Sequence, residues 1–383
     1  MTLIVHVTES LGGGVLYSIA QLAKAQADNG LDVVLVHSRR LDTPSAPELQ
    51  TLFPLPIKRV ELSMARAIAP INDLLSVLRL RRLFRRLKPD VIHLHSSKAG
   101  ALGRLAMMLC GINCQVVYSP RGFAFLRADV STNKQRLFLA IERIMSRLPG
   151  ILVACSETEA NLARQRVGHP DVRLVENSID LSCIKSASFG FKPRIRIVTS
   201  GRMTYAKAPW RFRKLAICLA HKPVDFVWIG GGENIDSEWR LVKEISVTKD
   251  LNFDSHGLPD GSAATLTATG WLRRDQVLNE LAEADIFVMT SLWEGMPLSL
   301  IEAQAAGLPA VVPDVVGCRD VVRPDVTGYV CVSDDELAQR VQDLIDMPEL
   351  RRRLGGQASH LAAGRFSVSR MHIEMLRVYG MLQ

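Results

Sequence analysis

Short apolar runs alternate with longer amphipathic stretches along the first half of the chain. The runs have the length and β-branched character of buried strands, and the stretches repeat apolar residues at helical spacing. The predicted strands are residues 2–7, 32–37, 57–61, 91–95, 115–118, 151–154 and 172–175. The predicted helices are residues 15–29, 71–87, 99–109, 134–148 and 157–166. This alternation predicts a parallel sheet with helices on both faces.

The pattern pauses at residues 177–193, where Ser, Gly, Lys and Pro replace the apolar period, and then restarts. Further strands are expected at 195–200, 225–229, 284–290 and 309–312, with a surface loop at 252–264. Helices are expected at 209–220, near 237–249, at 298–306 and over a long final region, 349–379. We therefore predict an α/β fold with one domain over 1–180, a second over 194–365, and a C-terminal helix over 366–383 that can cross back to the first.

The length and composition of the chain agree with two globular domains and indicate where in the cell the protein is expected. The 383 residues exceed one ordinary hydrophobic core. Seven scattered cysteines without a C-x-x-C pair favour reduced thiols and a cytoplasmic protein. No cationic segment precedes the first apolar run, and no apolar stretch approaches about 18 residues. Neither a signal peptide nor a membrane span is therefore expected.

Positive charge is concentrated in the first half of the chain. Residues 1–190 hold 24 Lys and Arg against 15 Asp and Glu, while the net charge of the whole chain is +8. Such a surplus favours phosphates, anionic lipid or nucleic acid, and composition leaves the three open. Residues 79–88 are especially basic, and Leu75, Leu83, Phe84 and Leu87 lie near one face of the same predicted helix. This helix is either an amphipathic surface for anionic lipid or the solvated face of an ordinary domain helix.

Two loops that follow predicted strands have the composition of phosphate sites. Gly12, Gly13 and Gly14 follow the first strand and open a helix, where backbone N–H groups can approach an anion. Their spacing is not G-x-G-x-x-G, so a dinucleotide site is disfavoured and a tight turn is the alternative. Arg202 and Lys207 follow the first strand of the second half, and two cations on one loop can converge on a diphosphate. The alternative there is a solvated loop.

Two glutamates stand around the start of the helix predicted at 298–306. Glu294 precedes it and Glu302 lies in its second turn, while Pro297 suits a first helical turn and Gly307 a C-cap. Carboxylates accept hydrogen bonds from hydroxyl groups, which is how proteins hold ribose and hexose. Structural roles, as a cap and as a half-buried helix acid, are the alternatives.

The segment S-x-x-E-G-x-P-x-x-x-I-E-A-x-A-x-G-x-P at residues 291–309 resembles the signature of the retaining glycosyltransferases of family 4. The stretches SLGGG, DVIHLHSSKAGALGRLA, ACSETEAN, VENSID, SGRMTYAK, WIGGGE and TGWL resemble the same family, and the likeness runs to about residue 330. It implies the GT-B fold, in which two Rossmann-like domains carry parallel sheets that face each other across a cleft.

The resemblance also implies a role for each matching residue. Glu302 would bind the ribose of the donor, Glu294 would approach the transferred sugar, and the segment around Trp271 and Leu272 would lie against the base. Arg202 and Lys207 would hold the diphosphate, and Gly12–Gly14 would close over it from the other domain. The remaining expected donor contacts are Gly295, Met296, Pro297 and Leu298.

The chain departs from the family after the strand at 115–118. Relatives usually place there a His that touches the donor sugar, whereas this chain has Arg121, which could pair with a donor or acceptor phosphate. His95, at the carboxyl end of its strand, is expected to line the acceptor cleft. His93 points to the same side as His95, but no third ligand stands nearby in sequence, so we expect no metal there.

The expected activity is retaining transfer of a hexose from a UDP-sugar, or next a GDP-sugar, to a saccharide acceptor. The acceptor is expected to be linked to a lipid diphosphate, as in bacterial polysaccharide synthesis, with the enzyme peripheral to the inner face of the membrane. Arg202, Lys207 and Glu294 are the expected catalytic residues. No cofactor or metal is expected, because no Asp-x-Asp motif ends a strand. The alternatives are a UDP-sugar 2-epimerase of the same fold and a basic nucleic-acid-binding protein, although no interleaved surface aromatics support the latter.

Overall fold

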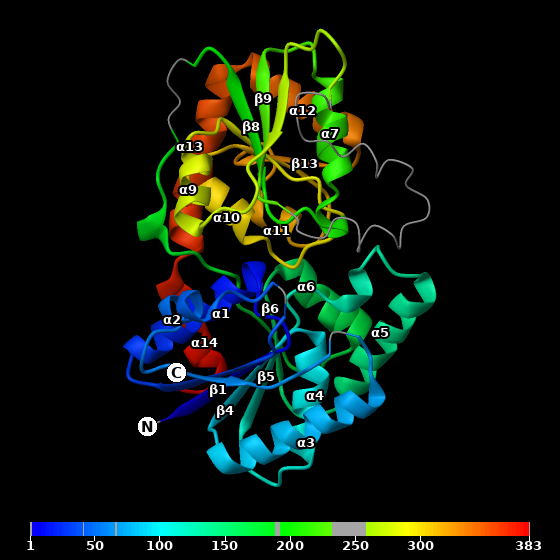
Figure 1. Cartoon of the computed structure of the whole chain (residues 1–383), viewed down its shortest axis with the longest axis vertical. Coiled ribbons are helices and arrows are strands. Elements are labelled where there is room, and N and C mark those ends of the chain that lie inside the picture. Colours follow the sequence, from blue (N-terminus) through cyan, green and yellow to red (C-terminus); the bar gives the residue numbers. More distant parts are fainter. Residues whose placement is uncertain (1, 41, 66, 188–191, 232–257, 383) are drawn as a thin grey trace. The chain divides into compact units, whose positions relative to one another are not determined.

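The computed structural model describes residues 2–40, 42–65, 67–187, 192–231 and 258–382, in two units (Figure 1). Unit 1 comprises Met1–Ile179 and Val368–Gln383, and unit 2 comprises Asp180–Ser367. The chain therefore leaves unit 1 after residue 179, builds unit 2, and returns to unit 1 with its last helix.

Unit 1 is built on a parallel seven-stranded sheet. Its strands are β1 (Leu3–Thr8), β2 (Asp32–His37), β3 (Lys58–Glu61), β4 (Val91–His95), β5 (Gln115–Ser119), β6 (Ile151–Ala154) and β7 (Val172–Leu174). Their order is β3-β2-β1-β4-β5-β6-β7, with His6 of β1 opposite His93 of β4. The direction of strand addition reverses between β1 and β4. In doubly wound sheets, ligands bind beyond the carboxyl ends of the strands at such a reversal.

Helices cover both faces of this sheet. They are α1 (Gly13–Asp28), α2 (Ala46–Leu52), α3 (Pro70–Leu87), α4 (Ser97–Met108), α5 (Thr132–Met145), α6 (Glu157–Leu162) and α14 (Val368–Val378). Met371, Met375 and Tyr379 pack with Ile4 of β1 and Val117 of β5 in one buried cluster. The last helix of the chain therefore completes the core around the central strands of unit 1 (Figure 1).

Unit 2 repeats the design with a parallel six-stranded sheet. Its strands are β8 (Ile195–Ser200), β9 (Val224–Ile229), β10 (Thr265–Ala268), β11 (Ile286–Val288), β12 (Ala310–Pro313) and β13 (Gly328–Cys331), in the order β10-β9-β8-β11-β12-β13. Its described helices are α7 (Pro209–Cys218), α9 (Arg274–Ala282), α10 (Leu298–Ala305), α11 (Cys318–Val321), α12 (Asp334–Asp346) and α13 (Pro348–Arg365). Strand addition reverses between β8 and β11, so the loops after these two strands lie at the expected ligand position.

The predicted fold class, two Rossmann-like α/β halves with parallel sheets, is confirmed. The final helical region expected over 349–379 consists of two helices, because α13 ends at Arg365 and the chain passes at the buried Phe366 from unit 2 to unit 1, where α14 follows. The sequence pattern missed α2, α9, α11, α12, β10 and β13. The helix expected near 237–249 and most of the loop expected at 252–264 lie outside the described residues.

The four apolar residues expected near one face of the basic helix do not all share one environment. Phe84 of α3 is fully buried, and Leu83 and Leu87 pack against the same core, whereas Leu75 is exposed on the other side of the helix. The residues expected together on a lipid-facing stripe therefore divide between core and surface. Within the described ranges, no helix has both the length and the apolar character needed to cross a bilayer.

Candidate active site

The loops after β8 and β11 of unit 2 are joined by hydrogen bonds. The backbone N–H of Leu292 donates to the carbonyl of Ala206 at 2.7 Å, and the hydroxyl of Thr290 donates to the carbonyl of Lys207 at 3.0 Å. The expected diphosphate loop and the expected sugar loop thus form one surface at the strand-order reversal.

Lys207 and Glu294 meet across these two loops. The ammonium of Lys207 lies 2.7 Å from Oε1 of Glu294, and the hydroxyl of Ser291 donates to the same oxygen at 2.7 Å. Both charged side chains are mostly buried. Arg202 lies on the same loop as Lys207, with its side chain exposed. Glu294 therefore neutralises one of the two cations expected to hold a diphosphate.

Close backbone approaches fix the shape of this surface. A Cβ on Gly230, which has φ +136°, would lie 2.2 Å from the carbonyl oxygen of Gly201, so only glycine fits there. The indole N–H of Trp228 donates to that same oxygen at 2.8 Å. A Cβ on Gly317 would lie 2.3 Å from the carbonyl oxygen of Gly295. Trp228 and Gly230 both lie in the quoted WIGGGE stretch, but the sequence predicted no individual role for them or for Gly317.

Glu302 is buried at the start of α10. Pro297 is the residue immediately before this helix rather than part of its first turn, and Met296, Pro297 and Leu298 are all buried. Nη2 of Arg274 lies 2.7 Å from Oε1 of Glu302. Burial raises the pKa of Glu302, and the charge of Arg274 opposes that shift. The carboxylate expected to bind ribose is therefore already paired, with a residue that sequence reasoning did not select.

Arg274 also connects Glu302 to the segment expected to contact the base. Trp271 and Leu272 precede Arg274 and lie between β10 and α9. Trp271 is 54% exposed, whereas Leu272 is half-buried. The exposed indole of Trp271, which precedes Arg274 in the chain, offers a stacking surface for a nucleobase.

In unit 1, the glycine loop lies beside an acid. The helix α1 begins at Gly13, two residues earlier than predicted, and Gly12 is its N-cap. A Cβ on Gly12 would lie 2.6 Å from a carboxylate oxygen of Asp42. A phosphate at Gly12–Gly14 would meet this negative charge unless the Asp42 side chain moves. Sequence reasoning missed Asp42, which lies far from Gly12 along the chain.

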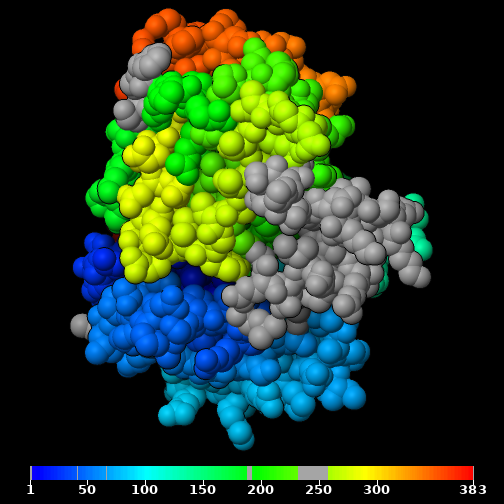
Figure 2. Space-filling model, turned by 45° about the horizontal axis from the view of Figure 1, so that its top comes forward, coloured from blue at the N-terminus to red at the C-terminus, as the bar shows by residue number. Residues whose placement is uncertain are grey.

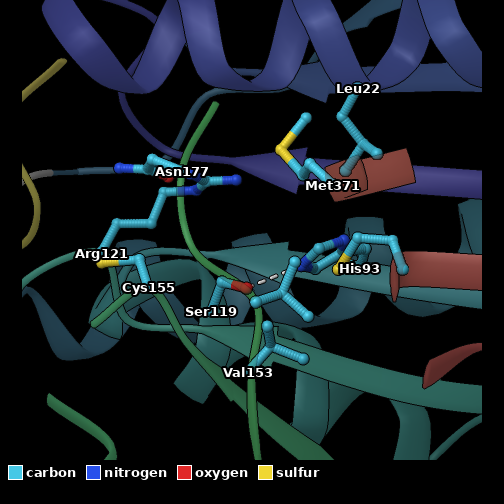
Figure 3. A pocket seen from close by; sticks show the side chains of 10 residues that line it. Leu22, His93, Ser119, Arg121, Val153, Cys155, Asn177 and Met371 are labelled. Atoms are coloured by element: carbon cyan, nitrogen blue, oxygen red, sulfur yellow. Dashed lines mark hydrogen bonds between the residues drawn. The ribbon is translucent and has the colours of Figure 1, made fainter. Parts of the chain in front are cut away.

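Arg121 reaches from the end of β5 into a buried polar network (Figure 3). Its Nε–H donates to Nδ1 of His95 at 3.1 Å, and its Nη1 donates to Ser18 and Asn177 at 2.6 and 3.1 Å. A guanidinium can only donate, so the proton of His95 lies on Nε2 and points to Nδ1 of His6, 2.9 Å away. In the described chain, Arg121 pairs with no carboxylate.

The network continues to the last helix. Nε2 of His6 bonds Gln26, whose amide donates to the hydroxyl of Tyr379. That hydroxyl bonds Nδ1 of His93 at 2.8 Å, and Nε2 of His93 bonds Ser119 at 2.8 Å. Burial lowers the pKa of His6 to about 4 and the pKa of His93 well below its usual range. These buried histidines are therefore neutral at pH 7.

His93 and His95 have a third possible metal ligand close to them, which is distant from them in sequence. His6 joins them from β1, and one ring nitrogen of each lies within 4.8 Å of the others. However, every ring nitrogen of the three already has a hydrogen-bond partner, and the Arg121 cation touches His95. The cluster fits a hydrogen-bond network better than a metal site. Its small pocket is lined by Arg121, His93, Ser119, Cys155, Asn177 and Met371, among others (Figure 3).

Arg121 and Ser96 have unusual backbone conformations at neighbouring strand ends. Their φ angles are +54° and +84°, in the left-handed region that non-glycine residues rarely occupy. The hydroxyl of Ser96 donates to the carboxylate of Glu9, which follows β1. Such conformations concentrate at functional sites. They therefore indicate a functional region at the carboxyl ends of β1, β4 and β5.

Two family models match the chain. The glycosyl transferase 4-like domain matches residues 13–178, and glycosyl transferases group 1 matches residues 260–360. The chain is 29% identical over 290 residues to UDP-Gal:alpha-D-GlcNAc-diphosphoundecaprenol alpha-1,3-galactosyltransferase of Escherichia coli, covering 71% of this chain and 70% of that protein. It is 24% identical over 291 residues to the O-antigen biosynthesis glycosyltransferase WbnH of Escherichia coli, covering 75% and 76%.

Solved structures show the same fold over the whole chain. Sucrose-phosphate synthase from Thermosynechococcus elongatus has a TM-score of 0.79 at 18% identity, covering 99% of this chain and 98% of that one. Anabaena HepE in complex with UDP and glucose has a TM-score of 0.76 at 17% identity, covering both chains completely (100%).

Proposed function

Because the chain belongs to the family 4-like glycosyltransferases, which have the GT-B fold, we propose that it transfers a hexose from a nucleotide-diphosphate sugar to a hydroxyl of a saccharide acceptor. UDP-hexose is the favoured donor and GDP-hexose the next, and the anomeric configuration is retained. The observation that carries this proposal is the meeting of Lys207 and Glu294 on the two loops at the strand-order reversal of unit 2.

Departure of the nucleotide diphosphate is the difficult chemical step. Negative charge grows on the leaving phosphate while the sugar becomes oxocarbenium-like. Arg202 and Lys207 neutralise that charge, and stabilisation of this kind is often the largest catalytic contribution. Glu294 contacts the hydroxyls of the transferred sugar. The leaving phosphate takes the proton of the incoming hydroxyl, so no protein base and no metal is required.

We assign the other donor contacts from the family resemblance. Glu302 binds the ribose, and the exposed Trp271 with Leu272 lies against the base. The remaining donor residues are Gly12, Gly13, Gly14, Gly295, Met296, Pro297 and Leu298. Because Arg274 already pairs with Glu302, one oxygen of this carboxylate stays anchored while the other accepts from ribose.

The acceptor is a saccharide on a lipid diphosphate, used in cell-surface polysaccharide synthesis at the inner face of the membrane. Support comes from the Escherichia coli relative, whose name specifies a diphosphoundecaprenol-linked acceptor. His95 and Arg121 contact this acceptor. The partners of Arg121 are neutral, so its positive charge remains available to a phosphate.

A thermal-shift screen of UDP-, GDP- and ADP-sugars tests the donor. A ligand at about 100 times its Kd adds roughly 2.7 kcal/mol to stability. Incubation of the protecting donor with a lipid-linked saccharide should then give a longer glycan, and the anomeric coupling in its NMR spectrum should report retention. Conversion of the nucleotide sugar without an acceptor would indicate an epimerase instead. Protection by RNA or DNA, but by no nucleotide sugar, would overturn the proposal.

A further inference from the structure

The outer face of α3 carries apolar side chains that nothing in the described chain covers. Their spacing of three or four residues puts them on one stripe of the helix. They are Ile71, Leu74, Leu75 and Leu78, which are 78%, 58%, 44% and 44% exposed. The opposite stripe, with Leu80 and Phe84, is fully buried in the core of unit 1. The core of unit 1 therefore does not depend on the exposed residues.

The same stripe becomes cationic in the second half of the helix. Arg82, Arg85 and Arg86 continue the spacing after Leu78, and all three are exposed. Within the described residues none of these three arginines has an ion-pair partner. The one acid of α3, Asp73, is paired instead with Lys98 of α4 at 2.6 Å. One helix face thus has an apolar first half and an uncompensated cationic second half.

The end of α4 extends the apolar part of this surface. Nε of Arg81 donates to the carbonyl of Leu109 at 2.7 Å, which holds the end of α4 against the middle of α3. Leu109 and Met108 are 52% and 61% exposed. The light-blue part of the chain that contains α3 lies at the surface in the space-filling view (Figure 2).

We propose that this surface, the α3 face (Ile71, Leu74, Leu75, Leu78, Arg82, Arg85 and Arg86), docks unit 1 on an anionic lipid bilayer. The apolar half enters the boundary between headgroups and acyl chains, and the arginines lie among the lipid phosphates. This inference deepens the proposed function, since it supplies the surface by which the enzyme reaches a lipid-linked acceptor.

A bilayer explains both halves of the face, whereas the rival occupants explain one each. A second copy of the chain could cover the leucines, but in a symmetric contact it would present the same α3 face, which has no acidic residue to pair with the arginines. A nucleic acid could pair with the arginines but would leave the leucines in water. An anionic membrane offers an apolar layer directly beside a layer of phosphates.

The test uses the full-length protein and vesicles of phosphatidylcholine with a third phosphatidylglycerol. One variant replaces Leu74, Leu75 and Leu78 with Asn, and another replaces Arg82, Arg85 and Arg86 with Gln. Arg81 is kept, because it holds the end of α4. The matched control replaces Leu137 and Ile144, exposed apolar residues of α5, with Asn.

Wild type and control should sediment with these vesicles, and both α3 variants should not. Each cation near the surface is worth about 1 kcal/mol, or about fivefold in partitioning, so loss of three should weaken binding by about a hundredfold. Wild type that stays in solution, or an α3 leucine variant that binds like the control, would overturn the proposal. A leucine variant that only changes a dimer into a monomer would assign the face to a second copy.

Activity on a water-soluble acceptor separates this proposal from the proposed function. All variants should keep the turnover of wild type there, because the α3 face includes none of the proposed donor or acceptor residues. If vesicle binding follows the prediction while no protein transfers sugar, the docking surface stands and the proposed reaction falls.

Discussion

Replacement of Glu294 by Gln should have opposite effects on nucleotide binding and on catalysis. Glu294 holds the ammonium of Lys207 at 2.7 Å in the protein without ligand. A diphosphate must share or displace that contact, and it also meets the negative charge of the carboxylate. The variant keeps the shape of the side chain but releases Lys207, so UDP should bind more tightly.

The size of the effect follows from the surroundings of the pair. The side chains of Lys207 and Glu294 are 21% and 13% exposed, so solvent weakens their attraction without removing it. Partly exposed ion pairs are worth up to about 1 kcal/mol, which predicts a gain of about fivefold in UDP affinity. Turnover of the UDP-sugar should nevertheless fall by about tenfold or more, since the hydroxyls of the sugar lose a charged acceptor.

Isothermal titration with UDP and initial rates with the UDP-sugar measure the two effects. Asp346→Asn is the matched control, because it breaks another ion pair of unit 2, between Asp346 and Lys222, away from both loops. Its UDP affinity should equal that of wild type. If Glu294→Gln binds UDP no better than wild type, Lys207 is not held back by Glu294. If the variant also turns over normally, Glu294 has no contact with the sugar.

Three further outcomes are expected. Glu302→Gln should weaken donor binding roughly ten- to a hundredfold, by the loss of charged hydrogen bonds worth about 1.5–3 kcal/mol; an unchanged donor Kd would exclude a ribose contact. Arg202→Ala and Lys207→Ala should each lower kcat by about 10²–10³ with a smaller change in KM, and wild type should work in EDTA; silencing by the chelator would assign the leaving-group charge to a metal. Burial lowers the pKa of His6 to about 4 in the folded protein, so below pH 6.5 the unfolded chain takes up a proton that the folded protein does not. The contribution of His6 to the free energy of unfolding should therefore be fully present above pH 6.5. It should decline towards pH 4 by up to about 1.4 kcal/mol per pH unit per histidine. Thermal unfolding of wild type and His6→Gln measures this, and equal pH slopes would contradict it.

The sheet strands were the most predictable part of the fold, for a physical reason. Strands covered on both faces are mostly apolar, so runs such as 32–37, 91–95 and 195–200 stand out and match β2, β4 and β8. The strand β13 (Gly328–Cys331) begins with a glycine and is short, so its signal is weak. The helix α9 is mostly polar, and its burial depends on neighbours that the local sequence does not specify. The helix α12 could have been predicted, because Leu337, Val341 and Leu344 follow helical spacing after the N-cap Ser333.

The candidate site was predictable only where its residues follow a strand. Lys207 and Glu294 could be brought together by topology, because their loops flank the strand-order reversal. The ion pair of Arg274 with Glu302 could not be predicted in this way, because it depends on how α9 packs against α10. The third histidine was missed for the same reason. His6 becomes a neighbour of His93 only through the register of β1 and β4, which are distant in sequence.

The return of the chain to unit 1 has a consequence for synthesis on the ribosome. All of unit 2 emerges before Tyr379, whose hydroxyl bonds His93 and whose ring packs with Met371 and Met375 in the core of unit 1. Domains generally fold as they emerge, but unit 1, which emerges first, completes its core only after unit 2 has emerged. Until α14 and Tyr379 emerge, Ile4 lacks its apolar cover and His93 lacks the hydroxyl of Tyr379 as a partner. A chain cut short before residue 368 would therefore keep an exposed apolar patch around Ile4 in unit 1. Chaperones and proteases that bind such a patch would distinguish these fragments from chains that include α14.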